Sequence, residues 1–147
     1  MDLSDVDRIA AGDGYLAVVA TTRADGGVQA SVVNAGTLAH PVTHDPVVAF
    51  VTYGKVKLAH LRARPRLTVV FRSGWEWVAV EGTGEIVGWD DPLAGFDPAG
   101  LPSLLRDIFR AAGGTHDDWA TFDRAMAEER RAAVLVHPER VYSNPTR

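Results

Sequence analysis

The sequence predicts a mainly β domain: a small, curved antiparallel barrel of about six strands, with about four short helices around it. Strand-like segments near the start are joined by the turn Ala24-Asp25-Gly26-Gly27, whose Asp-Gly pair tolerates positive φ and favours a hairpin. The longest strand-like segments contain glycines, which permit the bulges that a closing barrel needs. A chain of 147 residues without cysteine suits one domain, residues 1–147, that needs no disulfide to fold.

A short helix and a hairpin open the chain. Residues 3–11 carry a narrow apolar stripe, and Ser4 is the expected N-cap residue. The hairpin strands are expected at residues 15–22 and 28–39. The second strand mixes apolar and polar residues, and Gly36 within it indicates a bulge or the close approach of another backbone.

The middle of the chain is expected to form strand, glycine turn, helix and strand. Residues 47–53 are the third strand, and Gly54 closes the turn that follows it. Residues 56–63 form a short helix, which Pro65 ends. The fourth strand follows at residues 67–71.

The fifth strand is the longest, and two helices follow it. It spans residues 75–89, and Gly82 and Gly84 permit a sharp bend within it. Residues 101–112 form an amphipathic helix that ends at a glycine pair, and Thr115 is the expected cap of the next helix.

The last strand is expected at residues 132–136. Pro138 and Glu139 then turn the chain, and residues 140–142 add a few extended residues.

Composition disfavours several classes of protein. The net charge is −4 with signs mixed along the chain, so a nucleic-acid binder, including an RNA-binding barrel, is not expected. The acidic N-terminus lacks the features of a signal peptide, and no apolar run approaches the roughly 20 residues of a membrane span. We therefore expect a cytoplasmic protein without a membrane partner.

The sequence contains no motif for metal binding or acid–base catalysis. Its five histidines are dispersed, its serines lie in no nucleophile elbow, and it has no cysteine, so we expect no metal site and no catalytic side chain. Glu76, Glu81 and Glu85 could supply a carboxylate pair, although charged residues on strands usually guard against aggregation.

Two lysines lie in the first turn of the middle helix. Lys55 and Lys57 follow Gly54, at the helix end that already carries positive dipole charge, where cations are mildly unfavourable. An anion bound to the backbone N–H groups there would explain them. The alternative is a solvated lysine pair on a surface turn, and the lysines alone do not decide between the two.

Trp75 and Trp77 lie at the start of the fifth strand. They could pack in a core or an interface, or they could form a flat wall against an aromatic ring. A phosphate anchor with an aromatic wall and no acid–base residues indicates a bound cofactor that carries the reaction.

The order of the motifs resembles a known family. The runs T-Y-G, K-x-K-x-x-x-L-R-x-x-P-R-L-T and W-x-W-V-x-V-E-G are similar to those of the split-barrel flavin and deazaflavin reductases, the pyridoxamine-phosphate-oxidase-like superfamily. The run T-H-D-D-W-A-T-F-D-R-A-M-A-E-E-R-R, followed by V-L-V-H-P-E-R-V-Y, resembles the coenzyme F420-dependent branch. The resemblance covers Tyr15 to Tyr142.

The resemblance implies a six-stranded split β-barrel that forms a homodimer, with a deazaflavin or flavin at the subunit interface. It implies that Lys55 and Lys57 hold the cofactor phosphate, with Thr52 near them. It implies that Trp77 contributes from the partner subunit. The residues that it places along and under the cofactor ring are Ser31, Val32, Val33, Asn34 and Val51.

The function that the resemblance implies is hydride transfer from reduced F420 to an electron-poor, conjugated small molecule. The alternatives are the same barrel with FMN, or a protein that binds a deazaflavin, flavin or haem without turnover. The C-terminal residues SNPTR lack the tryptophan and substrate arginine of the vitamin oxidase, so pyridoxamine-phosphate oxidation is not expected. Arg62, Arg64 and Arg66 could form a groove for the polyglutamate tail of F420, or they could be solvated surface.

Overall fold

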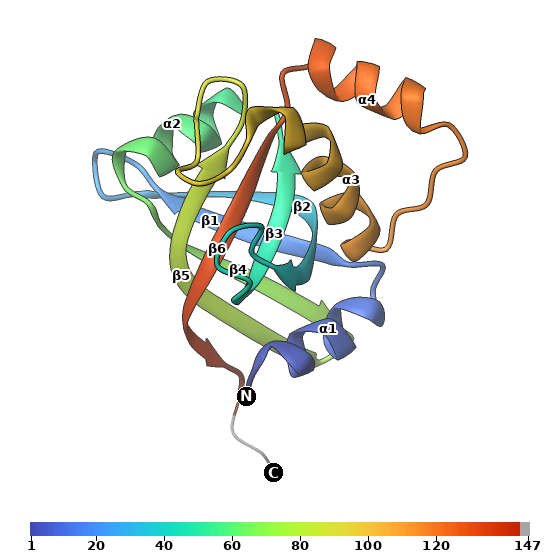
Figure 1. Ribbon diagram of the computed structural model, residues 1–147. Coiled ribbons are helices and arrows are strands. Elements are labelled where there is room, and N and C mark those ends of the chain that lie inside the picture. The colour runs from blue at the N-terminus through green and yellow to red at the C-terminus, as the bar shows by residue number, and fades with distance from the viewer. Residues whose placement is uncertain (145–147) are drawn as a thin grey trace.

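A computed structural model, which describes residues 1–144, shows a closed barrel of six antiparallel strands (Figure 1). The order around the barrel is β1-β2-β3-β6-β5-β4. The strands are β1 Leu16–Thr22, β2 Val28–Ala39, β3 Pro46–Thr52, β4 Arg66–Ser73, β5 Glu76–Val87 and β6 Ala132–Tyr142. The predicted fold class, an antiparallel barrel with flanking helices, is confirmed.

Four α-helices and one 3-10 turn lie on the outside of the barrel (Figure 1). They are α1 Leu3–Ala11, α2 Lys55–Ala63, η1 Pro98–Gly100, α3 Leu101–Ala111 and α4 Trp119–Glu128. None of the helices within residues 1–144 combines the length and the apolar character that crossing a bilayer requires.

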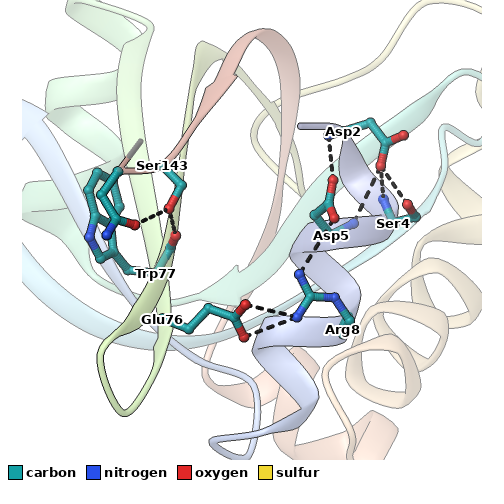
Figure 2. A network of polar contacts seen from close by, with 8 residues as sticks. Asp2, Ser4, Asp5, Arg8, Glu76, Trp77 and Ser143 are labelled. Carbon is teal, nitrogen blue, oxygen red and sulfur yellow. Dashed lines mark hydrogen bonds and ion pairs between the residues drawn. The ribbon is translucent and has the colours of Figure 1, made fainter. Parts of the chain in front are cut away.

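Two predicted helix caps were wrong by a few residues. Asp2, not Ser4, caps α1: its carboxylate accepts hydrogen bonds from the backbone N–H groups of Ser4 and Asp5, and the Asp5 side chain accepts one from the N–H of Asp2 (Figure 2). This reciprocal arrangement is a capping box, and it satisfies more N–H groups than Ser4 could reach. Asp118 rather than Thr115 caps α4, through the N–H of Thr121 at 3.1 Å.

Alternating strand residues supply two hydrophobic cores. One side of each strand fills the barrel, and its largest fully buried side chains include Phe50 and Phe71. The other side of β3 and β6 packs under α3, where Leu135 meets Leu105 and Ile108. Because β6 is buried on both faces, residues 132–136 form a continuous apolar run.

The fifth and last strands differ from their predicted bounds. β5 begins at Glu76, because Gly74 adopts a positive φ of 61° and leaves Trp75 in the turn, 97% exposed. β6 continues to Tyr142 instead of turning at Pro138: Pro138 pairs with Gly82 and Arg140 with Glu81, so Glu139 between them is the extra residue of a bulge.

Gly36 is where α3 meets the barrel. A Cβ at this position would lie inside contact distance of the Ala111 carbonyl and the Ala112 nitrogen, so the predicted close approach is confirmed. The helix end is fixed by a glycine motif: the N–H of Gly113 donates to Arg110 and that of Gly114 to Phe109, with Gly113 at φ +81°. These contacts set the position of the helix relative to β2.

We expect Gly36→Ala to lower the free energy of unfolding by about 3 kcal/mol, because the added methyl group meets main-chain atoms that cannot rotate away. For a chain of this size the melting temperature should fall by roughly 6–12 °C. Thr37→Ala, at the half-buried neighbouring position, is the control. Equal melting temperatures for Gly36→Ala and the wild type would contradict the tight docking of α3.

Candidate functional site

A cleft of about 690 Å³ opens between the strands and the two C-terminal helices. Its volume lies in the range of small-molecule sites. The strand wall is lined by Val32, Val33, Asn34, Val51, Thr52, Tyr53, Gly54, Lys57 and Arg131. The helical wall is lined by Ile108, Phe109, Ala112, His116, Thr121, Phe122, Ala125 and Met126.

The strand wall contains an edge of β2 that lacks a strand neighbour. The ladder between β2 and β3 begins at the pair Ala35–Phe50, so residues 31–34 run past the paired part of β3. On their other side the same residues pair with β1. Along this stretch, nothing within residues 1–144 adds a strand on the β3 side, so main-chain groups there face the cleft and can bind a ligand that offers matching donors and acceptors.

Ser31 ends this edge with a buried hydroxyl. Its Oγ has no hydrogen-bond partner within the described part of the chain. Buried polar atoms are normally paired, so this unpaired hydroxyl is an exception. Ser31 does not itself line the cleft, whereas Val32, Val33 and Asn34 do.

The cleft contains one of the two lysines that begin α2. Lys57 lines it half-buried, with Nζ 5.7 Å from the centre of the Phe50 ring. Burial lowers the pKa of Lys57, and no carboxylate of residues 1–144 lies within ion-pair distance of it. Lys55 is exposed and does not line the cleft.

The start of α2 offers backbone donors beside Lys57. Gly54 is the N-cap residue and provides no side chain to cap the helix. Thr52 is buried, and its hydroxyl accepts a hydrogen bond from the N–H of Gly54 at 3.0 Å, which fixes the turn. The first-turn N–H groups of a helix lack intrahelical partners and favour an anion.

Every ionisable residue of the cleft is a base or a tyrosine. They are Lys57, His116, Arg131 and Tyr53; no aspartate or glutamate lines the cleft. The Arg131 guanidinium stacks over the Tyr53 ring at 4.3 Å from its centre and also pairs with Glu129 at 2.5 Å. Because Arg131 is already paired, the uncompensated positive charge of the cleft comes from Lys57, and it favours an anionic ligand.

Sequence reasoning missed Arg131 and the helical wall. Arg131 directly precedes β6, whose first residue Ala132 pairs with Thr52, and this pairing brings the arginine to the cleft. The apolar residues of α3 and α4 have the spacing of ordinary core-facing helices, so no local signal separated cleft-lining from buried positions.

The two tryptophans lie away from this cleft. Trp77 and Trp75 line a groove with Val70 and Arg72 on another part of the surface. The Trp77 carbonyl accepts a hydrogen bond from the Ser143 hydroxyl, as Figure 2 shows. The predicted contribution of Trp77 to a partner's cofactor therefore stays a prediction about a second chain.

The three arginines at the end of α2 are engaged within the chain. Arg62 binds Asp91 through two hydrogen bonds of 2.9 and 2.6 Å, and Arg66 pairs with Glu139 at 2.5 Å. The Nε of Arg64 donates to the Thr22 carbonyl at 3.0 Å. These partners neutralise or occupy the groups that a polyglutamate groove would need.

The glutamates of β5 do not form a carboxylate pair. Glu76 pairs with Arg8 at 3.0 Å (Figure 2), and Glu81 accepts a hydrogen bond from the Tyr142 hydroxyl at 3.2 Å. Each of them, like Glu85, has its own partners.

Glu85 joins two histidines that are far apart in the sequence. Its Oε1 lies 2.7 Å from Nε2 of His40 and 3.0 Å from Nε2 of His137. Burial disfavours the charged carboxylate, but the hydrogen bonds from both histidines outweigh it and lower the pKa of Glu85.

These three residues could geometrically hold a metal ion. However, Nδ1 of His40 accepts the N–H groups of Val42 and Thr43, both at 3.1 Å, so the ring hydrogen lies on Nε2. A metal-binding nitrogen must be free of hydrogen, whereas His40 uses its hydrogen to bind Glu85. The cluster is therefore arranged as a hydrogen-bonded tie between the β2–β3 loop, β5 and β6.

Comparison with known proteins gives one family match. Residues 12–144 match the family described as pyridoxamine 5'-phosphate oxidase, which is most of the chain.

Several solved structures share the fold. The conserved hypothetical protein Rv2991 from Mycobacterium tuberculosis is 18% identical with a TM-score of 0.67, over 96% of this chain and 82% of that chain. A structure described as an F420 reductase is 16% identical with a TM-score of 0.57, over 88% and 90%. A pyridoxamine 5'-phosphate oxidase-related, FMN-binding protein from Nostoc punctiforme is 12% identical with a TM-score of 0.63, over 96% and 84%. At these identities the likeness shows the fold alone.

We expect Lys57→Met to raise the free energy of unfolding of the ligand-free protein by up to about 1 kcal/mol near neutral pH, because it removes a half-buried charge that lacks a carboxylate partner. The folded-state pKa of Lys57 is lowered, so the unfolded chain binds more protons between that pKa and the ordinary lysine value of about 10.4. Wild-type stability should therefore rise with pH through this window, and the advantage of the variant should shrink.

Urea unfolding at about pH 7 and about pH 10 measures both effects. Lys55→Met is the matched control, because Lys55 is exposed at the same helix start. Equal unfolding free energies of the two variants at both pH values would contradict the claim that burial of the charged Lys57 side chain destabilises the folded protein.

Proposed function

Because the chain belongs to the pyridoxamine 5'-phosphate oxidase family, we propose that it is an oxidoreductase that binds coenzyme F420 in the cleft described above. Its reaction would transfer a hydride from the reduced deazaflavin to an electron-poor, conjugated small molecule. The observation that carries the proposal is the unpartnered β2 edge at residues 31–34, which faces a cleft whose only charged side chains are cationic.

The positive groups fit the phosphate of such a cofactor. Lys57, Arg131 and the first-turn N–H groups of α2 lie at one end of the strand wall, around Thr52 and Gly54. A phosphate there would supply the negative charge that the desolvated lysine lacks. Lys55, exposed on the same turn, would act at longer range.

The β2 edge and the apolar walls fit a planar ring. Main-chain groups of residues 31–34, Ser31 among them, can bind the polar edge of a heterocycle. Val33 and Val51 provide apolar surface on the strand wall. When bound, a reduced deazaflavin supplies the hydride, while the chain contributes orientation, charge and exclusion of water.

FMN is the second candidate cofactor. It shares the phosphate and the planar ring, and an FMN-binding protein is among the structures of similar fold. The intramolecular pairing of Arg62, Arg64 and Arg66 removes one argument that favoured the polyglutamate tail of F420. Direct comparison of the two affinities separates the candidates.

We also propose that the protein acts as a homodimer. Val32, Val18 and Val70 lie opposite one another on β2, β1 and β4 and form an aliphatic row on the outside of the barrel. Val32 is 64% and Val18 42% exposed, which is unusual for contiguous apolar residues of a monomer. Val32 also lines the cleft, so a second chain covering this row would cover the open side of the cleft.

Side-by-side fluorescence titrations with F420 and FMN test the cofactor. We expect Lys57→Ala to weaken binding of the preferred cofactor by about 1–3 kcal/mol, or roughly 5- to 150-fold, because a charged hydrogen bond to phosphate is lost. Lys55→Ala should have a smaller effect. Unchanged affinity in Lys57→Ala would exclude this lysine from the site, and turnover with a quinone or enone would separate an enzyme from a carrier.

Sedimentation analysis tests the dimer. We expect the wild type to be dimeric and Val18→Glu to be monomeric, because a carboxylate in the aliphatic row would be desolvated on association. Val28→Glu is the control, since Val28 is 62% exposed on β2 but lies outside the row. A monomeric wild type, or a dimeric Val18→Glu variant, would exclude this surface as the interface.

A further inference from the structure

The helical wall of the cleft carries two polar side chains, Thr121 and His116. The Thr121 hydroxyl donates to the Asp118 carboxylate at 2.7 Å, so its hydrogen is already used. Asp118 in turn caps α4 through the N–H of Thr121. This leaves His116 as the hydrogen-bond donor that the helical wall can offer to a ligand.

The backbone determines which nitrogen of His116 carries hydrogen. Nδ1 accepts the N–H of Asp118 at 3.0 Å, so the ring hydrogen lies on Nε2. A second hydrogen on Nδ1 would point at that N–H. Within residues 1–144, Nε2 has no hydrogen-bond partner. The nearest carboxylate to the ring is that of Asp117, which lies on the other side, 4.0 Å from Nδ1.

Aromatic neighbours lie on one side of the imidazole ring, and the His116 side chain is 30% exposed. Its centre lies 5.8 Å from those of Trp119 and Phe122 and 6.4 Å from that of Phe109. The Arg110 guanidinium lies over the Trp119 ring, 4.4 Å from its centre, and this cation–π contact stabilises the aromatic cluster. These neighbours and the hydrogen bond to Nδ1 restrict the orientations of the ring, so part of its rotamer entropy is lost before a ligand binds.

We propose that His116 is a substrate-contacting residue whose Nε2–H binds a carbonyl oxygen of a planar acceptor molecule. The inference rests on the proposed function, in which a cofactor passes a hydride to an acceptor. It places the cofactor on the β2 edge and the acceptor on the helical wall of the same cleft. It extends that function by naming the polar group that the acceptor must carry: an oxygen that accepts one hydrogen bond from a neutral donor.

The same geometry gives His116 a role other than that of a general acid. Loss of the Nε2 hydrogen from a ring whose Nδ1 carries none would leave an imidazolate. His116 therefore keeps its hydrogen, orients the carbonyl and polarises it. The remaining wall residues, Phe109, Phe122 and Met126 among them, contact the apolar part of the acceptor.

Two substitutions separate the donor from the backbone contact. In His116→Asn, the amide oxygen can replace Nδ1 as acceptor for the Asp118 N–H, but the donor at Nε2 is lost. In His116→Gln, the longer amide can place an N–H near the Nε2 position, while the Nδ1 acceptor is lost. The first variant therefore tests the donor and the second tests its restoration.

Two ligands of the same shape provide the readout on the full-length, cofactor-free protein. We would titrate 2-methyl-1,4-naphthoquinone and 2-methylnaphthalene by NMR chemical shift and compare their affinities within each variant. The chain has no cysteine, so the quinone cannot form a thioether adduct. Taking the ratio within a variant cancels any general loosening of α4.

We expect the wild type and His116→Gln to prefer the quinone by about tenfold, and His116→Asn to lose that preference. Long-range ¹H–¹⁵N spectra should show the Nε2–H form of His116 and a shift of that nitrogen on quinone binding. Equal affinity for the two ligands in the wild type, a preference retained in His116→Asn, or hydrogen on Nδ1 would each overturn the proposal.

F420 affinity should be the same in all three proteins, because the cofactor is assigned to the opposite wall. If F420 does not bind the wild type, the proposed function fails, while the quinone preference still decides the role of His116.

Discussion

The separation of two neighbouring strands is the constraint on which the rest of the structure depends: β3 continues through Val51 and Thr52, but these residues no longer pair with β2. β2 spans twelve residues and β3 seven, and their ladder begins only at Ala35 and Phe50. A closed barrel normally leaves no exposed strand edge, yet here part of β2 lacks a neighbour on one side. The separation of β2 from β3 leaves both a cleft and a row of unpaired main-chain groups, which can bind a flat polar ligand.

The helical wall depends on a second close contact. Because Gly36 lacks a side chain, the end of α3 approaches β2 closely, and the glycine motif after it directs the chain into the loop that carries His116. Had α3 packed at an ordinary distance, Phe109 and His116 would lie farther from the strand edge. Backbone packing in the core therefore sets the width of the cleft, and the polar residues are placed on walls that are already rigid.

Charge in the cleft follows from the same closure. The end of β3 and the start of β6 are paired through Thr52 and Ala132, so Lys57, which follows β3, and Arg131, which precedes β6, line the same cleft although they are far apart in the chain. Elsewhere several arginines are neutralised by carboxylates, as Arg62 is by Asp91 and Arg66 by Glu139. The contrast between paired surface arginines and a lysine without a carboxylate partner in the cleft is the strongest electrostatic indication of an anionic ligand.

Much of this architecture was determined by local signals that act within a few residues. The Asp-Gly hairpin, the close approach at Gly36 and the lysines at the start of α2 were predicted, because turn chemistry, steric size and helix dipoles do not need the rest of the fold. Tertiary structure alone decided the partners: that Asp91 neutralises Arg62, that Glu85 joins His40 and His137, and that Arg131 and His116 face the same cleft as Lys57. Barrel closure brings together residues separated by most of the chain, and no spacing in a single sequence reports which strand edge will be left without a neighbour.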